Sequence, residues 1–488
     1  MNLNIIFYAG ILISGLLLQS CNRVPEHKEQ IAVNITTNKP GQNISEESVG
    51  LSYETKQLLP DENGVHYFSQ DNTSLLKMFK TLGVRNLRIG GNSVDASNIP
   101  IPDEDDLHSF FQFAKAAKVK VIYSVRLQDG DPKSAQQIAK VINENYSDVL
   151  ESLAIGNEPS YYEDYEVYVS KWTAIRDAIL EVYPDAVFCG PDQNPDAERL
   201  KKLVDDFGYP EGRLVQLTQH NYPFGCSYQN YRERDVTKLV PYDAEESIDK
   251  MLADTAYAIY EDILKGMVDA VEGTPITFRL SETNSFWYSG LKGASDRYAS
   301  ALWALDYMHW WTSHGAEGLN FHTGDLTGGE IILPCRYAAF VSSGIGYEAK
   351  PLAYGMKLFS LGGKGQSLPV DISSTSNHLL VAYANLNPPN EVLVTLINKA
   401  HKDKQSKEIS IQFDRSIIDS DVEVIFLNAE ANNIAATSSD LVLGNSQIEH
   451  DGTWEGHWQK LPESQVVDNS LTINLQPASA VLLRLKVQ

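Results

Sequence analysis

The chain has 488 residues, of which 43% are hydrophobic and 10% aromatic. This length exceeds one ordinary domain and allows a sizeable core, so we expect a barrel with a smaller second domain. The 64 acidic and 40 basic residues give a formal charge of −24, which would repel phosphate backbones and anionic membrane surfaces. The composition therefore argues against a nucleic-acid partner.

The first residues predict a secretion signal. A continuous apolar stretch from Ile5 to Leu18 runs into Leu18-Gln19-Ser20-Cys21, which is similar to the lipobox, where a signal peptidase cuts before Cys and the Cys thiol carries a diacylglycerol. The segment before this stretch lacks Lys and Arg, and an uncleaved membrane anchor is the alternative. We expect residues 1–20 to be a signal peptide, Cys21 to be lipidated and residues 21–30 to be a tether. The protein would then sit in a bacterial cell envelope, bound to the membrane through the lipid only.

The remaining cysteines do not suggest a disulfide framework or a metal site. Cys189, Cys226 and Cys335 are odd in number, without CxxC spacing or clustered histidines. We expect neither a metal nor a cofactor.

From Val49 to Phe321, short β-rich apolar runs alternate with longer segments of helical period, which is typical of βα units around a parallel sheet. The runs predict strands at Val49–Glu54, Val84–Ile89, Lys120–Val125, Leu150–Ile155, Ala186–Cys189, Leu214–His220, Ile276–Leu280 and Gly318–Phe321. The other segments predict helices at Leu75–Leu82, Asp105–Lys118, Ala135–Asn145, Glu163–Tyr183, Asp196–Phe207, Ala244–Val271, Ser295–His314 and Ala353–Leu361. We therefore predict an α/β fold, a (β/α)8 barrel over residues 45–362.

Beyond Gly362 the pattern changes to period-two runs separated by Asn, Ser, Pro and Gly. The runs are Leu379–Ala384, Glu391–Asn398, Glu408–Phe413, Val422–Asn428 and Leu471–Leu475. They predict a C-terminal β-sandwich over residues 363–488. Residues 31–44 include a run of the same strand character, and we expect them to contribute a strand to this sandwich before the chain enters the barrel.

Two glutamates follow predicted barrel strands. Catalytic groups of such barrels lie at the carboxyl ends of the strands, and the fourth and seventh strands end in Asn157-Glu158-Pro159 and Ser281-Glu282-Thr283. Retaining glycosidases need a proton-donating carboxyl group and a nucleophilic carboxylate about 5–5.5 Å apart. Glu158 suits the acid/base, with Asn157 beside it for the sugar 2-hydroxyl, and Glu282 suits the nucleophile. Either glutamate alone could be a surface acid at a strand end.

Ordered motifs along the chain resemble those of glycoside hydrolase family 79, the clan A family of heparanase and of bacterial and fungal β-glucuronidases. The similarity spans about residues 45 to 362. Its motifs are Arg88-Ile89-Gly90-Gly91-Asn92, Gly156-Asn157-Glu158-Pro159, Gly190-Pro191-Asp192, His220-Asn221-Tyr222 and Ser281-Glu282-Thr283-Asn284. The resemblance implies a retaining β-glucuronidase that acts on carbohydrate bearing β-linked glucuronic acid.

Further site residues are implied by the same resemblance. Glu54 and Asn92 would bind sugar hydroxyls, Tyr222 would contact the nucleophile or the sugar, and His220 would be either a ligand or a supporting residue. The family holds the sugar carboxylate with backbone amides and tyrosines after the nucleophile, and the matching candidates are Tyr288, Gly290 and Tyr337.

Long segments after the sixth and eighth strands favour a closed pocket, and hence exo-cleavage of terminal glucuronic acid or its 4-O-methyl form. The acidic composition agrees, because a groove for sulfated chains should carry Lys and Arg clusters. The alternatives are a heparanase-like endo-β-glucuronidase, a clan A enzyme for another sugar, and a non-catalytic glycan-binding surface lipoprotein.

Overall fold

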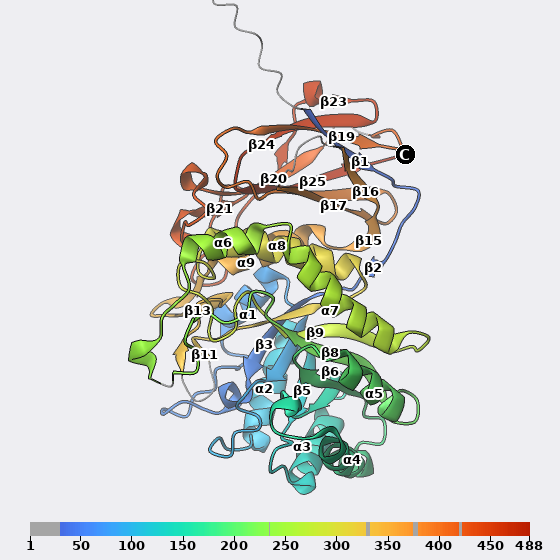
Figure 1. Cartoon of the computed structure of the whole chain (residues 1–488), viewed down its shortest axis with the longest axis vertical. Helices are drawn as coiled ribbons and strands as arrows, with labels where there is room; N and C mark the ends of the chain where they lie inside the picture. Colours follow the sequence, from blue (N-terminus) through green and yellow to red (C-terminus); the bar gives the residue numbers. More distant parts are fainter. Residues whose placement is uncertain (1–29, 234, 328–331, 374–378, 419–421) are drawn as a thin grey trace, which may run out of the picture.

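The computed structural model describes residues 30–233, 235–327, 332–373, 379–418 and 422–488 (Figure 1). The predicted signal peptide and the lipidation of Cys21 lie outside these residues. Among the helices of the described part, none combines the length and the apolar character needed to span a bilayer.

The first structural unit is a closed barrel of parallel strands, which confirms the predicted (β/α)8 fold. In chain order the barrel strands are β3 (Val49–Glu54), β4 (Asn86–Gly90), β5 (Lys120–Val125), β6 (Leu150–Ile155), β7 (Phe188–Gln193), β8 (Leu214–Asn221), β9 (Thr277–Thr283) and β10 (Leu319–His322). The barrel closes where β10 pairs with β3, with Leu319 opposite Val49. Because all strands run the same way, their carboxyl ends meet at one mouth.

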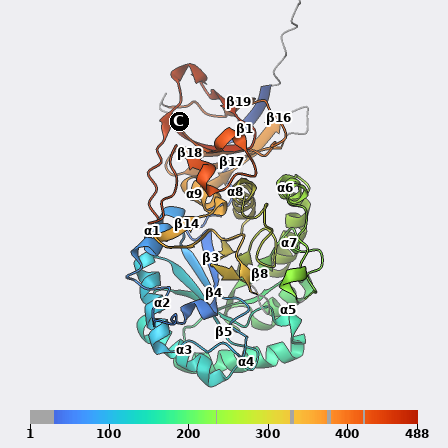
Figure 2. The same cartoon turned by 90° about the vertical axis from the view of Figure 1, so that its left-hand side faces the viewer.

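The helices form a ring around these strands (Figure 2). They are α1 (Thr73–Leu82), α2 (Glu104–Ala117), α3 (Pro132–Asn145), α4 (Tyr165–Val182), α5 (Ala197–Phe207), α6 (Ala244–Leu252), α7 (Ala256–Val271), α8 (Tyr298–Ser313) and α9 (Pro351–Gly362). The predicted single helix over Ala244–Val271 is wrong, because Ala253 has an extended backbone (φ −72°, ψ 146°) and separates α6 from α7. The break lets α6 pack on α8 while α7 packs on α5.

The second unit is a β-sandwich, as predicted. One sheet contains β16 (Val370–Ser373), β1 (Gln30–Ile35), β19 (Lys407–Phe413), β24 (Ser470–Leu475) and β23 (Val466–Val467). The other contains β2 (Asn43–Ile44), β15 (Gly365–Leu368), β17 (Leu380–Asn387), β18 (Glu391–Asn398), β25 (Ser479–Lys486), β20 (Glu423–Ala429), β21 (Leu441–Leu443) and β22 (Gln459–Lys460). Strand β1 lies between β16 and β19, so the chain crosses the sandwich before it enters the barrel.

The two units share one extended interface. Helices α8 and α9 lie between the barrel and the larger sheet (Figure 1), and α8 is buried along nearly its whole length. A helix that packs on both sides must be apolar all round, which explains the absence of a polar face in Ala301–Trp311. Gly355 allows this packing, because a Cβ there would lie 2.2 Å from the Ala301 carbonyl oxygen.

The segment after β10 adds two small hairpins at the barrel mouth. They are formed by β11 (Leu326–Thr327) with β12 (Leu333–Pro334) and by β13 (Phe340–Ser343) with β14 (Gly346–Ala349). Within the described residues, Cys189, Cys226 and Cys335 are free thiols.

Candidate active site

The two predicted catalytic glutamates both lie at the barrel mouth. Glu282 is the second-to-last residue of β9. Glu158 follows β6 and directly precedes the short 3-10 helix η2 (Pro159–Tyr161). Glu158 has a left-handed backbone (φ 49°, ψ 48°), and its amide donates a 2.7 Å hydrogen bond to the Asp192 carbonyl oxygen. Such strained backbone is tolerated where neighbouring contacts hold it, and it is common at functional sites.

Glu282 is surrounded by groups that favour its ionised form. Arg88 Nη1 donates to Oε2 over 2.7 Å, the Tyr222 hydroxyl donates to Oε1 over 2.8 Å, and His322 Nδ1 lies 3.7 Å from Oε2. Burial alone would raise the pKa of Glu282, but the charges of His322, His220 and Arg88 and the Tyr222 hydrogen bond lower it well below its usual range. Glu282 is therefore a carboxylate fixed in orientation through both oxygens.

Arg88 organises this network from the middle of β4. Its buried guanidinium also donates to Asp192 Oδ2 over 2.9 Å and to Asn157 Oδ1 over 2.8 Å. The side chain needs the absence of a Cβ at Gly90, because a Cβ there would lie 2.6 Å from Arg88 Cζ. Arg88 thus connects the ends of β4, β6, β7 and β9 across the barrel.

Glu158 has quite different surroundings. Its Oε1 lies 3.1 Å from His220 Nδ1 and accepts a 3.4 Å hydrogen bond from Asn194 Nδ2. The side chain keeps 19% of its surface exposed, whereas Glu282 keeps 11%. Among the described residues, His220 lies within ion-pair distance of Glu158, which lacks the arginine contact that holds Glu282.

His220 joins the two glutamates. Its ring is fully buried, with Nδ1 toward Glu158 and Nε2 3.4 Å from Arg88 Nη2. The pairing of β8 with β9 sets His220 beside Glu282 in register. The structure therefore brings the predicted residue His220 between Glu158 and the Arg88 network.

Glu54 and Asn92 reach the same region from β3 and from the turn after β4. Glu54 Oε2 accepts from the Ser93 amide over 2.8 Å, and Oε1 lies 3.7 Å from His322 Nε2 without a hydrogen-bond partner in the described part of the chain. The turn brings backbone so close that a Cβ at Gly91 (φ +66°) would lie 2.6 Å from Glu54 Oε2. Asn92 accepts a 3.3 Å hydrogen bond from the Asn157 side chain.

Of the loop residues predicted to bind a sugar carboxylate, Gly290 and Tyr337 lie close together near Tyr222, whereas the Tyr288 ring has other neighbours. The ring of Tyr337 lies 6.0 Å from that of Tyr222, and a Cβ at Gly290 would lie 2.9 Å from the Tyr337 amide nitrogen. Residues 288–290 have consecutive positive φ angles. The Tyr288 ring packs instead against Tyr228 at 5.7 Å and Trp287 at 5.9 Å.

Sequence reasoning assigned no role to several residues of the network. Arg88, Asp192 and His322 each contact a site carboxylate or its partner, and the Asn284 side chain donates to the His322 and Tyr337 carbonyl oxygens over 3.1 Å. Asp192 and His322 lie at the carboxyl ends of β7 and β10, the fifth and eighth barrel strands. The search for polar side chains at strand ends, which identified Glu158 and Glu282 on strands four and seven, would have identified these two residues as well. The signal that could have identified Arg88 is its position as a cationic residue inside a buried strand.

The described residues contain no group of His, Cys, Asp and Glu side chains arranged to hold a metal ion. The mouth brings together two carboxyl groups: Glu282, whose contacts with Arg88 and Tyr222 favour its ionised form, and Glu158, which contacts His220 and Asn194. This combination can break an acetal bond through a covalent intermediate.

No protein-family model matches the chain, and no curated protein matches its sequence. Solved structures do match over most of its length. A 4-O-α-L-rhamnosyl-β-D-glucuronidase from Fusarium oxysporum has 18% identity and a TM-score of 0.65, and the match covers 93% of this chain and 99% of that one. A GH51 arabinofuranosidase from Xanthomonas axonopodis pv. citri has 15% identity and a TM-score of 0.64, covering 94% and 100%.

A further match is an α-L-arabinofuranosidase from Thermotoga maritima, with 13% identity, a TM-score of 0.65 and coverage of 94% and 100%. Identities this low establish the fold and no more. The barrel with its added β-sheet domain is an architecture that this chain shares with enzymes that cleave glycosidic bonds.

Proposed function

We propose that this chain is a retaining glycoside hydrolase that releases terminal β-linked glucuronic acid, with Glu282 as the nucleophile and Glu158 as the acid/base. The observation that carries the proposal is the contrast between the two carboxyl groups. Arg88 and Tyr222 hold Glu282 as an anion, while Glu158 contacts an imidazole and an amide. Environments that separate two carboxyl groups in this way are the mark of an acid and nucleophile pair.

The reaction follows from this geometry. A Glu282 oxygen attacks the anomeric carbon while the bond from that carbon to the glycosidic oxygen breaks, and Glu158 gives its proton to the departing oxygen. The product of this step is a glycosyl ester on Glu282. Glu158, now a carboxylate, takes a proton from water as the water oxygen attacks the same carbon, and the bond from that carbon to the Glu282 oxygen breaks. The sugar leaves with retained configuration, and both glutamates return to their starting states.

Arg336 supports an acidic sugar as the substrate. Its amide donates a 2.7 Å hydrogen bond to the Ser289 carbonyl oxygen, and a Cβ at Gly290 would lie 3.1 Å from the Arg336 Cβ. Arg336 is a half-buried residue that forms no ion pair with any described residue, so its guanidinium is available to an anionic ligand. The fold match to a glucuronidase from Fusarium agrees with this assignment.

The proposal is tested with purified protein and 4-nitrophenyl glycosides of β-D-glucuronic acid, β-D-glucose and α-L-arabinofuranose at pH 4–8. We expect release from the glucuronide alone, and NMR should show the β-anomer as the first free sugar. Release of arabinose would favour the second candidate, an arabinofuranosidase. Two of the proteins with a matching fold are named as arabinofuranosidases. If the aryl glucuronide is untouched while heparan oligosaccharides are cut internally, the enzyme is an endo-β-glucuronidase.

We also propose that the enzyme is anchored to the bacterial cell envelope through a lipid on Cys21. The support is the Leu18-Gln19-Ser20-Cys21 motif. The variant Cys21→Ala should lose incorporation of labelled fatty acid, and retention of the label would contradict the anchor.

A further inference from the structure

A recess lies beside Glu158, and it shares Asn157 with the Arg88 network that holds Glu282. It has a volume of about 170 Å³ and is lined by side chains that include Asn92, Asp95, Gln128, Glu158, Tyr161 and Tyr162. Glu158 is the member that it shares with the catalytic pair, and the partners of Glu282, Arg88 and Tyr222, do not line it. In the proposed reaction, Glu158 touches the oxygen that joins the reacting sugar to its leaving group. Space beyond Glu158 therefore receives the leaving group.

Tyr161 gives this recess an aromatic wall. Its side chain is 71% exposed, an unusual state for a tyrosine beside a buried network. The ring is nevertheless fixed, because Asn194 Nδ2 donates to its hydroxyl, and the same nitrogen reaches Glu158 Oε1 over 3.4 Å. A flat ring that stays exposed while its hydroxyl is tied down presents a face for stacking. Asn194 also connects the position of this ring to that of the acid/base.

The charges around the recess define what it can accept. Among the described residues that line the recess, none is Lys or Arg. The acids are Asp95, which is saturated by the amides of Leu127, Gln128 and Asn157 and by the Tyr162 hydroxyl, and Glu158, which becomes negative as it protonates the leaving oxygen. An anionic leaving group would therefore face a carboxylate without a paired cation.

We propose that this recess is a leaving-group subsite for an uncharged sugar, which stacks on Tyr161 while its hydroxyls meet the side-chain amides of Asn92 and Gln128. The inference rests on the proposed glucuronidase function and adds the class of the aglycone. The substrates are then glycans in which glucuronic acid caps a neutral sugar, and sulfated chains are excluded by the charge of the subsite.

The first test compares three substrates of the full-length wild-type enzyme. These are glucuronic acid β-1,3-linked to galactose, the same disaccharide carrying a 6-sulfate on galactose, and β-D-glucuronyl fluoride, whose leaving group is a single atom. We expect kcat/KM for the neutral disaccharide to exceed that for the sulfated one by at least about tenfold, which is the effect of one poorly paired charge. Equal or faster cleavage of the sulfated disaccharide overturns the inference, and so does cleavage of the fluoride with neither disaccharide touched.

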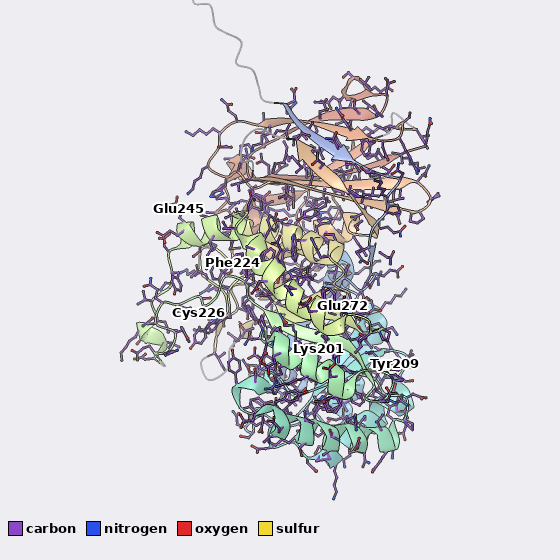
Figure 3. All side chains as sticks on the ribbon, turned by 45° about the vertical axis from the view of Figure 1, so that its right-hand side comes forward. Lys201, Tyr209, Phe224, Cys226, Glu245 and Glu272 are labelled. Carbon is purple, nitrogen blue, oxygen red and sulfur yellow. The ribbon has the colours of Figure 1, made fainter. Side chains whose placement is uncertain are left out.

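The second test uses the stacking ring. In Tyr161→Ala, the ratio of kcat/KM for the neutral disaccharide to that for the fluoride should fall about tenfold through KM. In Tyr161→Phe, which keeps the stacking face but loses the hydroxyl that Asn194 holds, the ratio should fall less than in Tyr161→Ala, by about two- to threefold. Tyr209→Ala is the matched control, because Tyr209 is an exposed tyrosine on the opposite side of the barrel from the mouth loop that holds Cys226 (Figure 3).

The outcomes separate the two proposals. An unchanged ratio in Tyr161→Ala overturns the subsite while the glucuronidase function stands. A wild-type enzyme that cleaves neither disaccharide nor the fluoride overturns the glucuronidase function, and the subsite falls with it.

Discussion

Two buried clusters of this molecule each combine a cation with a carboxylate and a tyrosine, and yet they differ in completeness. The interface cluster consists of Asp306 on α8, Tyr257 on α7, and Lys399 and Tyr383 from the sandwich. Asp306 accepts from the Tyr257 hydroxyl over 2.8 Å, from the Tyr383 hydroxyl over 2.6 Å and from Lys399 over 3.1 Å. Both charged members are at least nine-tenths buried, and the acceptor is satisfied by protein groups alone.

The Arg88 network at the mouth is left incomplete. Arg88 Nε and Glu54 Oε1 are buried without a hydrogen-bond partner among the described residues, and Glu158 and Glu282 retain some exposed surface. Buried polar atoms that lack a partner cost stability unless a ligand satisfies them. The comparison teaches that a closed cluster serves cohesion, while an open one is prepared for a substrate.

The largest effect should come from removing the nucleophile. In Glu282→Ala, kcat for 4-nitrophenyl β-glucuronide should fall about 10⁴-fold or more, because the covalent intermediate cannot form. Added azide should restore turnover with an α-glucuronyl azide as the product, detected by NMR. Glu272→Ala, a change at an exposed glutamate on the side of the barrel away from the mouth (Figure 3), should match wild type. An unaltered rate in Glu282→Ala would remove it from the nucleophile role.

Breaking the interface cluster should reduce stability and leave catalysis intact. Asp306→Asn leaves Lys399 with the more exposed Asp254, 3.6 Å away, as its carboxylate partner, and we expect the free energy of unfolding to fall by about 3 kcal/mol in urea titrations. Asp205→Asn, which breaks an exposed pair with Lys201, should cost less than about 1 kcal/mol. The folded Asp306→Asn enzyme should keep kcat within about twofold of wild type. A drop in kcat without a loss of stability would contradict the comparison.

The sequence was sufficient for the fold because its periodicities are local. Each barrel strand was predicted within a few residues, and the change to period-two runs after Gly362 marked the sandwich. The break at Ala253 could not be read, since alanine favours a helix and only packing against α8 bends the chain there. Likewise, α8 lacks a polar face because the larger sheet of the sandwich covers the side of the helix that faces away from the barrel.

The two glutamates of the candidate site were predicted from the sequence, whereas the arginine that connects their surroundings was assigned no role. Glu158 and Glu282 could be predicted because strand ends converge at the mouth. Arg88 lies within a strand, and its contacts with Asp192 and Glu282 join residues 104 and 194 positions apart. Such contacts depend on barrel closure, which no local pattern expresses.

Arg336 tests whether a cation without an ion-pair partner among the described residues contributes to substrate binding. Arg336→Gln should lower kcat/KM for the aryl glucuronide by about ten- to a hundredfold, which corresponds to the loss of one charge-assisted hydrogen bond. Arg415→Gln in the sandwich, whose guanidinium bonds to the carbonyl oxygen of Gln488, is the control and should have no effect. Equal rates for both variants would show that the backbone turn at Gly290 binds the sugar carboxylate without help from this cation.

The smallest expected effect lies at the floor of the barrel, where Glu47 is near Glu151. Burial and then the charge of Glu151 raise the pKa of Glu47 from 4.5 to about 7. The folded state therefore binds more protons than the unfolded state between these values, so this group favours folding most at or below pH 4.5 and its contribution is lost as the pH rises through 7. Glu47→Gln should flatten the pH dependence of the unfolding free energy between pH 5 and 8 and raise stability at pH 8. The exposed neighbour change Glu46→Gln should leave the wild-type profile, and a wild-type slope in Glu47→Gln would assign the proton to another group of the floor.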